Sequence, residues 1–318
     1  MKGVISLGEA LIDFIPLDPG NTTYQKSPGG APANVAVGLA RLGAKSAFLG
    51  KVGNDVLGSF LRRTMEENQV DVRHMTFTDD ARTGVVFVTL DPTGERHFSF
   101  YIDPSADRYL EEDDIVETLF AENKILHFGS ISLIGEPSAS ATRKAVKAAK
   151  AAGMLISYDP NLRLGLWESE ELAKQTILSM LPAADVLKIS DEELTFLTGE
   201  TDIEAGLDEL ERYNIPLIFV TMGGAGSIYR FHRESGKVPA MKVETVDTTG
   251  AGDAFVSAIL YCLNDTDKRL DQMTVQDIQE MVRFASVSGG LAASKKGAMT
   301  ALPTLEEVKR ILEKEGAN

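Results

Sequence analysis

The segment Asp247-Thr248-Thr249-Gly250-Ala251-Gly252-Asp253-Ala254-Phe255 leads directly into an apolar run typical of a helix. Its two glycines let main-chain N–H groups face outward where that helix begins. Such amides, together with the helix dipole, form a cradle for an anion. Asp253 at the edge of the cradle would accept the proton of an attacking hydroxyl while the amides hold a phosphoryl group. From these residues alone, the alternative interpretation is that the segment is an ordinary loop and that Asp253 only caps the helix.

Two other glycine-rich loops precede or follow predicted elements. Pro28-Gly29-Gly30-Ala31-Pro32-Ala33-Asn34 precedes a helical run, and Asn34 either caps that helix or holds a ligand hydroxyl through its amide. Thr221-Met222-Gly223-Gly224-Ala225-Gly226-Ser227 follows a strand, but it lacks the Lys-Ser/Thr ending of a P-loop and the third glycine of a dinucleotide fingerprint. A tight β-turn is the alternative for this loop.

Outward from these loops, short β-rich runs alternate with amphipathic helical runs along most of the chain. That alternation is typical of βαβ units, and it predicts an α/β fold with a mainly parallel central sheet flanked by helices. No Pro-rich or Ser-rich linker interrupts it, so a single domain over residues 1–318 is predicted. The predicted core strands are 4–7, 46–52, 125–128, 155–158, 186–189 and 217–221, and the predicted helices include 138–152, 276–293 and 305–312.

Two segments break this rhythm. Residues 11–26 continue past the first strand through the turn Asp18-Pro19-Gly20-Asn21, and residues 83–102 alternate as a hairpin around Asp91-Pro92-Thr93-Gly94. We expect both segments to form antiparallel strands outside the parallel core. They would make a small β-sheet lid over the carboxyl ends of the core strands, where open α/β sheets bind ligands.

Polar residues follow several predicted strands. Asp13 interrupts an apolar strand, and Asp159-Pro160-Asn161-Leu162-Arg163 sets a turn and a guanidinium at the same edge of the sheet. Lys188 ends another strand, and Glu193 lies in the first turn of the helix after it. Glu193 is placed for a water-mediated Mg²⁺ contact or, alternatively, for a helix cap only.

The composition limits the partners. In 318 residues, 32 Lys and Arg against 47 Asp and Glu give a net charge of −15, and no long basic run offsets it. Nucleic acid and anionic membrane surfaces are therefore excluded as expected partners. A single cysteine, and no apolar stretch of the length of a signal peptide or membrane span, predict a cytoplasmic setting.

The whole chain resembles a known family. Segments 29–43 (GGAPANVAVGLARLG) and 247–255 are similar to the two signatures of the ribokinase-like carbohydrate kinases, the PfkB family. Between them, 50–58 (GKVGNDVLG), 103–107 (DPSAD), 127–133 (HFGSISL) and 157–163 (SYDPNLR) resemble fructokinase segments in the expected order. The resemblance implies a ribokinase-like fold and ATP-dependent phosphorylation of a sugar, with D-fructose and its 6-hydroxyl as the expected acceptor.

The resemblance also implies roles for particular residues. Asp253 would be the catalytic base and the amides of Gly250, Ala251 and Gly252 the anion hole. Glu193 would contact Mg²⁺ through water. The implied sugar site is Asp13, Gly29, Gly30, Asn34, Tyr101, Arg163 and Asp253; the implied ATP site is Lys188, Thr221, Gly223, Gly226 and Ser288; and the implied site for a monovalent cation, K⁺, is Asp247, Thr249, Ala292, Lys295 and Gly297.

Two departures from the family pattern matter. Ser190 stands where many members have Asn, which predicts an altered metal–water network. Ile102 follows Tyr101 where many fructokinases and 2-keto-3-deoxygluconate kinases have Arg, which disfavours an anionic sugar acid as acceptor. The alternative acceptors are 2-keto-3-deoxygluconate, ribose and a nucleoside.

Two other classes of protein fit the sequence less well. An NAD-dependent dehydrogenase needs a Gly-x-Gly-x-x-Gly turn near the start, which Leu7-Gly8-Glu9-Ala10 does not supply. A non-catalytic sugar sensor would lack the base that Asp253 provides. Because lid strands of this kind have exposed edges, we also expect a homodimer that pairs them through residues near 11–26 and 83–101.

Overall fold

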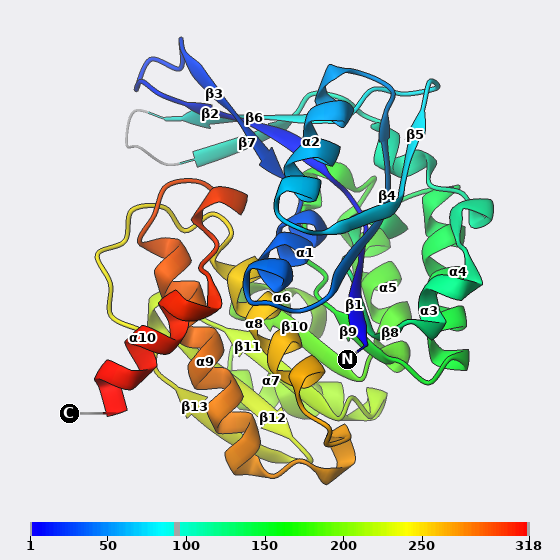
Figure 1. Ribbon diagram of the computed structural model, residues 1–318. Helices are drawn as coiled ribbons and strands as arrows, with labels where there is room; N and C mark the ends of the chain where they lie inside the picture. Colours follow the sequence, from blue (N-terminus) through cyan, green and yellow to red (C-terminus); the bar gives the residue numbers. More distant parts are fainter. Residues whose placement is uncertain (1, 92–95, 317–318) are drawn as a thin grey trace.

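The central sheet has nine strands in the order β13-β12-β11-β10-β9-β8-β1-β4-β5. The computed structural model (Figure 1) describes residues 2–91 and 96–316 of the chain. All neighbours from β11 to β5 are parallel, and β12 and β13 are antiparallel additions at one edge. The strands are β1 Gly3–Leu7, β4 Ser46–Gly53, β5 Asp71–Thr78, β8 Asn123–Phe128, β9 Leu155–Tyr158, β10 Val186–Ser190, β11 Leu217–Thr221, β12 Ser227–Phe231 and β13 Glu234–Val238.

All six predicted core strands are confirmed, with ends that differ by two residues or fewer. They read clearly in the sequence because both faces of a parallel sheet are covered, which requires near-continuous apolar runs. Strand β5 escaped prediction since its residues alternate in burial and include Arg73 and His74.

Helices cover both faces of this sheet (Figure 1). Apolar side chains of α1, α8, α9 and α10 pack on one face, and those of α3 to α7 on the other. In α4, Ala141, Ala145 and Ala149 form a stripe that is buried in the core. The helices are α1 Ala31–Arg41, α2 Val56–Glu67, α3 Glu117–Ala121, α4 Ser138–Ala151, α5 Glu170–Met180, α6 Asp191–Thr198, α7 Ile203–Leu210, α8 Ala251–Asp265, α9 Val275–Ala293 and α10 Leu305–Gly316.

A second sheet of four strands, in the order β3-β2-β6-β7, extends beyond one edge of the body (Figure 1). Its strands are β2 Leu11–Pro16, β3 Tyr24–Gly29, β6 Gly84–Leu90 and β7 Arg96–Phe100. The expectation of an all-antiparallel sheet was wrong in one respect, because β2 and β6 pair in parallel. Most of the predicted hairpin turn, residues 92–94, lies outside the described residues.

Helices α1 and α8 begin at the edge of the body that faces the small sheet, and they pack closely. A Cβ atom on Gly38 of α1 would come 2.5 Å from the Ser257 hydroxyl of α8, so only glycine allows this approach. The contact brings the glycine-rich loops that open the two helices together, although they are far apart in sequence. Among the described residues, none of the helices has the length and apolar character needed to cross a membrane.

Candidate active site

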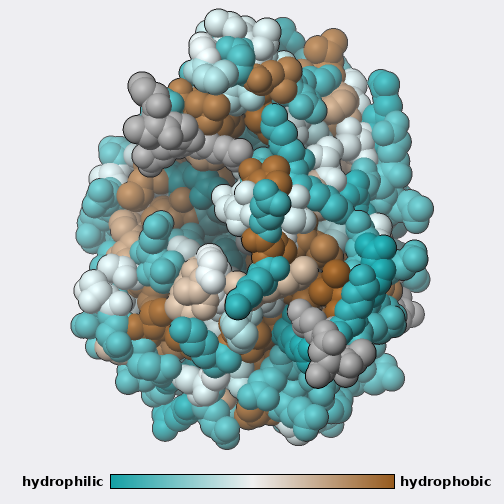
Figure 2. Space-filling model, turned by 90° about the vertical axis from the view of Figure 1, so that its left-hand side faces the viewer, coloured by the Kyte–Doolittle hydropathy of each residue, from teal (hydrophilic) through white to brown (hydrophobic). Residues whose placement is uncertain are grey.

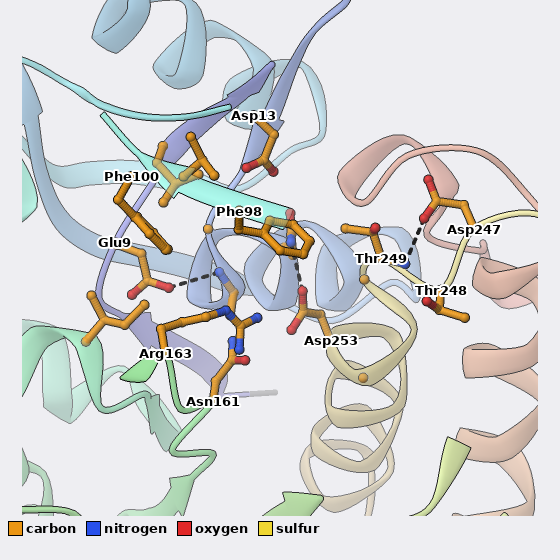
Figure 3. A pocket seen from close by; sticks show the side chains of 18 of the residues that line it. Glu9, Asp13, Phe98, Phe100, Asn161, Arg163, Asp247, Thr248, Thr249 and Asp253 are labelled. Carbon is orange, nitrogen blue, oxygen red and sulfur yellow. Dashed lines mark hydrogen bonds between the residues drawn. The ribbon is translucent and has the colours of Figure 1, made fainter. Parts of the chain in front are cut away.

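A cavity of about 950 Å³ lies between the small sheet and the body. Figure 2 shows it as a hollow in the face of the molecule below the small sheet. Both glycine-rich helix starts open into it, as do the loop after β9 and the end of β10 (Figure 3). It is lined by Glu9, Leu11, Asp13, Gly30, Ala31, Asn34, Val86, Phe98, Phe100, Ile131, Asn161, Arg163, Lys188, Glu192, Thr245, Val246, Asp247, Thr248, Thr249, Gly250, Gly252 and Asp253.

Asp253 lies in the first turn of α8, at the floor of this cavity. The Asn34 side-chain amide of α1 donates a hydrogen bond of 2.8 Å to its Oδ2 atom. Burial is the main reason that the pKa of Asp253 rises to about 6, and the Asn34 hydrogen bond opposes the rise. A carboxyl with this pKa is ionised at neutral pH yet is a stronger base than an exposed aspartate, as a general base requires.

This environment predicts how activity depends on pH. Because Asp253 must be ionised to act as base, kcat/KM should fall on acidification through about pH 6. Replacing Asn34 with alanine removes a hydrogen bond to the carboxylate, so the pKa and the acid limb should move to higher pH. Initial rates measured from pH 5 to 9 check both points. A limb that stays in place or moves down in N34A would argue against Asp253 as the titrating group.

The amides predicted to form an anion cradle lie at the start of α8. Gly250 adopts a left-handed conformation (φ 78°) as the residue before the helix, and it contributes no side-chain cap. The Ala251 amide already donates to the Thr248 carbonyl at 3.1 Å, so it is engaged in the turn itself. A Cβ atom on Gly252 would lie 3.6 Å from the Lys188 ammonium nitrogen, which places that charge beside the cradle.

Lys188 lies in β10 with its side chain 13% exposed and forms an ion pair with Asp159, with 3.0 Å between Nζ and Oδ2. Burial opposes its charge, but Asp159 and Glu193 outweigh burial and raise its pKa. The side chain is therefore a fixed ammonium. A cation beside a helix N-terminus is suited to holding phosphate oxygens.

Asp13, on β2 of the small sheet, and Arg163, in the loop after β9, both line the cavity (Figure 3). Burial raises the pKa of Asp13 to about 7, and the charge of Arg163 opposes that rise. Gly29 of β3, which pairs with Leu11, leaves space for Asp13, because any Cβ there would overlap the Asp13 carboxylate. Gly30 lines the cavity with φ 100°, a conformation that glycine adopts without strain.

The prediction of Tyr101 as a sugar contact does not fit this structure. Its side chain is 73% exposed, and its ring packs edge-on against Phe87 at 5.5 Å. Phe98 and Phe100 line the cavity in its place, because alternate residues of a strand face opposite sides (Figure 3). The same alternation in the sequence could have found them.

Ser288 also departs from its predicted role beside the nucleotide. It is fully buried in α9, and its hydroxyl donates to the Ala254 carbonyl of α8 at 3.0 Å. It therefore joins two helices rather than reaching a ligand. Thr221, Gly223 and Gly226 lie in and after β11, next to the end of β10, outside the lining of the cavity.

Glu193 is engaged by the main chain. Its Oε2 atom accepts from the Ser190 amide at 2.8 Å, completing a capping box with Ser190, and its Oε1 atom accepts from the Leu162 amide at 2.7 Å. These bonds tie the loop that carries Arg163 to the start of α6. In the described part of the chain, no three His, Cys, Asp or Glu side chains are grouped as metal ligands.

The residues predicted to hold a monovalent cation gather around the end of α9. The Asp247 carboxylate, only 2% exposed, accepts from the Thr249 amide at 2.9 Å and the Gly297 amide at 3.0 Å. The Asp247 amide donates to the Ala293 carbonyl, and the Ala292 carbonyl receives the Lys295 amide. Asp247 thus joins the segment before α8 to the loop after α9.

Together, a buried base at a helix N-terminus, a fixed ammonium and a small sheet over a polar cavity define a small-molecule kinase on an α/β fold. The class can be made more specific. The chain belongs to the pfkB family of carbohydrate kinases, whose sequence pattern matches residues 1–305.

Named relatives agree with this assignment. A protein of Arabidopsis thaliana named probable fructokinase-6, chloroplastic, is 47% identical over 317 residues, which cover 97% of this chain and 82% of the relative. A fructokinase double mutant from Vibrio cholerae O395, solved with fructose, ADP and potassium ion, is 41% identical with a TM-score of 0.90 and 98% of both chains covered. Aminoimidazole riboside kinase from Salmonella enterica, solved with aminoimidazole riboside and an ATP analogue, is 30% identical with a TM-score of 0.87, covering 98% of this chain and 99% of its own.

Proposed function

We propose that this protein transfers the γ-phosphoryl group of ATP to the 6-hydroxyl of D-fructose, giving fructose 6-phosphate and ADP. One observation carries the chemistry: Asp253, hydrogen-bonded to Asn34, opens helix α8 at the floor of the cavity, with Lys188 beside it. The choice of acceptor draws support from the full-length similarity to proteins named fructokinase, one of them solved with fructose and ADP.

In the proposed reaction the Asp253 carboxylate takes the proton of the 6-hydroxyl as its oxygen attacks the γ-phosphorus. The bond to the bridging oxygen of ADP breaks in line with the attack. Amides at the start of α8 and the Lys188 ammonium stabilise the charge on the transferring group. The small sheet acts as a lid that excludes water, so that ATP is not simply hydrolysed.

We propose that the nucleotide binds along the start of α8 and the ends of β10 and β11, near Lys188, Thr221, Gly223 and Gly226. Asp13, Gly29, Gly30, Asn34 and Arg163 are proposed to hold the sugar. Arg163 and Lys188 are the cationic side chains lining the cavity, which makes its ends suitable for phosphate despite the net charge of −15.

Mg²⁺ is proposed to arrive with ATP. It neutralises charge on the phosphate oxygens when bound. The described residues fit a nucleotide-borne ion, since they offer no cluster of three protein ligands and Mg²⁺ in kinases keeps several waters. Glu193, with both oxygens accepting amides, is proposed to reach it through water only.

A potassium ion is proposed beside Asp247, with main-chain oxygens near Thr249, Ala292, Lys295 and Gly297 as further ligands. A buried carboxylate held by two amides, next to the end of α9, has the chemistry of such a site. The potassium-bound form of the related Vibrio cholerae enzyme supports the choice of ion.

The acceptor is tested by ADP release with D-fructose, 2-keto-3-deoxygluconate, ribose and aminoimidazole riboside. We expect kcat/KM to be at least about tenfold higher for D-fructose than for any other, because the relatives named fructokinase match the chain over nearly its whole length. A higher kcat/KM for another acceptor in this panel would show that this acceptor, and not fructose, is the substrate.

We also propose a homodimer formed through the small sheet. Its edge strand β7 carries Phe98, which is 49% exposed, and an unpaired strand edge of this kind favours association. Sedimentation velocity at micromolar concentration should give a dimer. Replacing Phe98 with glutamate should shift the chain to monomer, whereas glutamate at Val56, an exposed residue of α2, should not. A wild-type chain that sediments only as monomer would contradict the proposal.

A cytoplasmic location is proposed from the single cysteine, which rules out an internal disulfide. Because one relative is named chloroplastic, a plastid is the alternative compartment. Cell fractionation with an antibody to the native chain decides between the two.

A further inference from the structure

Glu9 is a buried acid at the cavity that the proposed reaction does not use. It follows β1 in the turn to β2, its side chain is 3% exposed, and it lines the same cavity as Asp253. Figure 3 shows it near Phe100 and Arg163. Burying a glutamate side chain costs free energy unless its oxygens have hydrogen-bond partners. The partner of each oxygen therefore has to be identified.

One oxygen of Glu9 has a structural role. Its Oε1 atom accepts the Ala31 amide at 3.1 Å, and Ala31 is the first residue of α1. Gly30, which precedes that helix, offers no side-chain cap. Glu9 therefore caps α1 from a distant part of the chain and fixes the loop that also presents Asn34.

The other oxygen has no such role. Among the described residues, Oε2 of Glu9 is buried without a hydrogen-bond partner. A buried polar atom left unpaired costs about 1–3 kcal/mol, so it is rare unless a ligand completes it. Glu9 lines the cavity, and because Oε2 has less than 1 Å² of accessible surface, a substrate hydroxyl would pair with it after a small shift of the side chain.

The neighbours of Glu9 place it away from the reacting end of the cavity. The charges that act on it are those of Asp107, which raises its pKa, and Arg163, which lowers it. In Figure 3 the Arg163 side chain lies between Glu9 and Asp253, so Glu9 faces the part of the cavity away from Asp253.

The protonation of Glu9 suits this place. Burial, more than any neighbour, raises its pKa to about 8, so the carboxyl is mostly protonated at neutral pH. A neutral carboxyl both donates and accepts, as a sugar hydroxyl does, and it adds no negative charge to the cavity.

We propose that Glu9 positions the sugar: Oε1 holds the Ala31 amide, and Oε2 hydrogen-bonds a hydroxyl at the end of the acceptor remote from the one that is phosphorylated. The proposal rests on the proposed function. For fructose phosphorylated at carbon 6, the remote hydroxyls are those on carbons 1 and 2.

The test compares wild type with Glu9→Gln and Glu9→Leu on D-fructose, 1-deoxy-D-fructose and 2,5-anhydro-D-mannitol, which lacks the carbon 2 hydroxyl. Glutamine keeps an acceptor for Ala31 and a polar group at the Oε2 position, so the KM for fructose should stay within about fivefold of wild type. Leucine should raise that KM by about 10- to 100-fold with kcat and the KM for ATP little changed.

The analogues separate sugar contact from capping. If Oε2 binds a remote hydroxyl, wild type should have a higher KM for the analogue that lacks that hydroxyl. On that analogue, Glu9→Leu should raise the KM over the wild-type value by less than about threefold, because the contact is already lost. Equal losses by Glu9→Leu on all three acceptors would reduce Glu9 to a helix cap and overturn the proposal. Should Glu9→Leu fail to fold, wild type alone decides, because equal KM values for fructose and both analogues would contradict the contact.

Failure of the proposed function would look different. A wild-type enzyme that does not phosphorylate fructose refutes the function, and the ratio test then moves to deoxy analogues of the acceptor that the panel identifies. If wild type phosphorylates fructose and the variants lose activity equally on every acceptor, only the proposed role of Glu9 is refuted.

Discussion

Replacing Asp253 with asparagine is expected to lower kcat by about 10³- to 10⁴-fold, because the change removes the base that takes the hydroxyl proton. Asparagine keeps the shape of the side chain and an oxygen that can accept from Asn34, which now donates at 2.8 Å. The fold and the nucleotide site should therefore persist. Steady-state ADP release gives kcat, and calorimetry should give an ATP dissociation constant within about threefold of wild type.

The matched control is Asp265→Asn, which changes an exposed aspartate at the other end of the same helix. It should leave kcat unchanged. Turnover of Asp253→Asn or Asp253→Ala within about tenfold of wild type would refute the assignment of Asp253 as base.

The second large effect is expected at Lys188. Methionine there removes the ammonium beside Gly252 and should lower kcat by about 10²- to 10³-fold, the loss typical of one group that stabilises transition-state charge. It also leaves Asp159, which is 4% exposed, without its ion-pair partner at 3.0 Å. That should destabilise the fold by about 3–5 kcal/mol.

A double variant separates the two effects. Lys188→Met with Asp159→Asn removes both charges of the ion pair, so denaturant unfolding should recover most of the stability. The kcat should remain low, because the phosphoryl group still lacks the ammonium. Recovery of kcat along with stability would show that Lys188 acts only in the fold.

The sequence predicted best what lies in contiguous motifs. The segment 247–255 predicts a helix N-terminus with Asp253 in its first turn, and α8 begins there, at Ala251. The partner of Asp253 is 219 positions away, at Asn34, and only the packing of α1 on α8 brings the two together. The resemblance to a family placed both residues in the implied sugar site, but it did not predict the hydrogen bond between them.

Other features depend on the direction in which side chains point and on how helices pack, and sequence motifs do not encode either. Tyr101 and Phe100 are neighbours in sequence, yet Phe100 lines the cavity and Tyr101 is 73% exposed, on Phe87. Ser288 is polar on a helix near the nucleotide region, but tight helix packing turns its hydroxyl to Ala254. Glu9 directly follows a buried strand and its turn in the sequence, and only the fold brings it to the cavity and to the start of α1.

The central claim is that ATP phosphorylates carbon 6 of D-fructose in the cavity that Asp253 and Lys188 border. The most direct measurement is carbon and phosphorus NMR of the product formed from ATP and ¹³C-labelled fructose by wild-type enzyme, with Asp253→Asn in parallel. The account predicts phosphorus coupling on carbon 6 and ADP in equal amount, with no detectable product from the variant over the same time. Phosphate on another carbon, or ADP with inorganic phosphate and unchanged fructose, would contradict it.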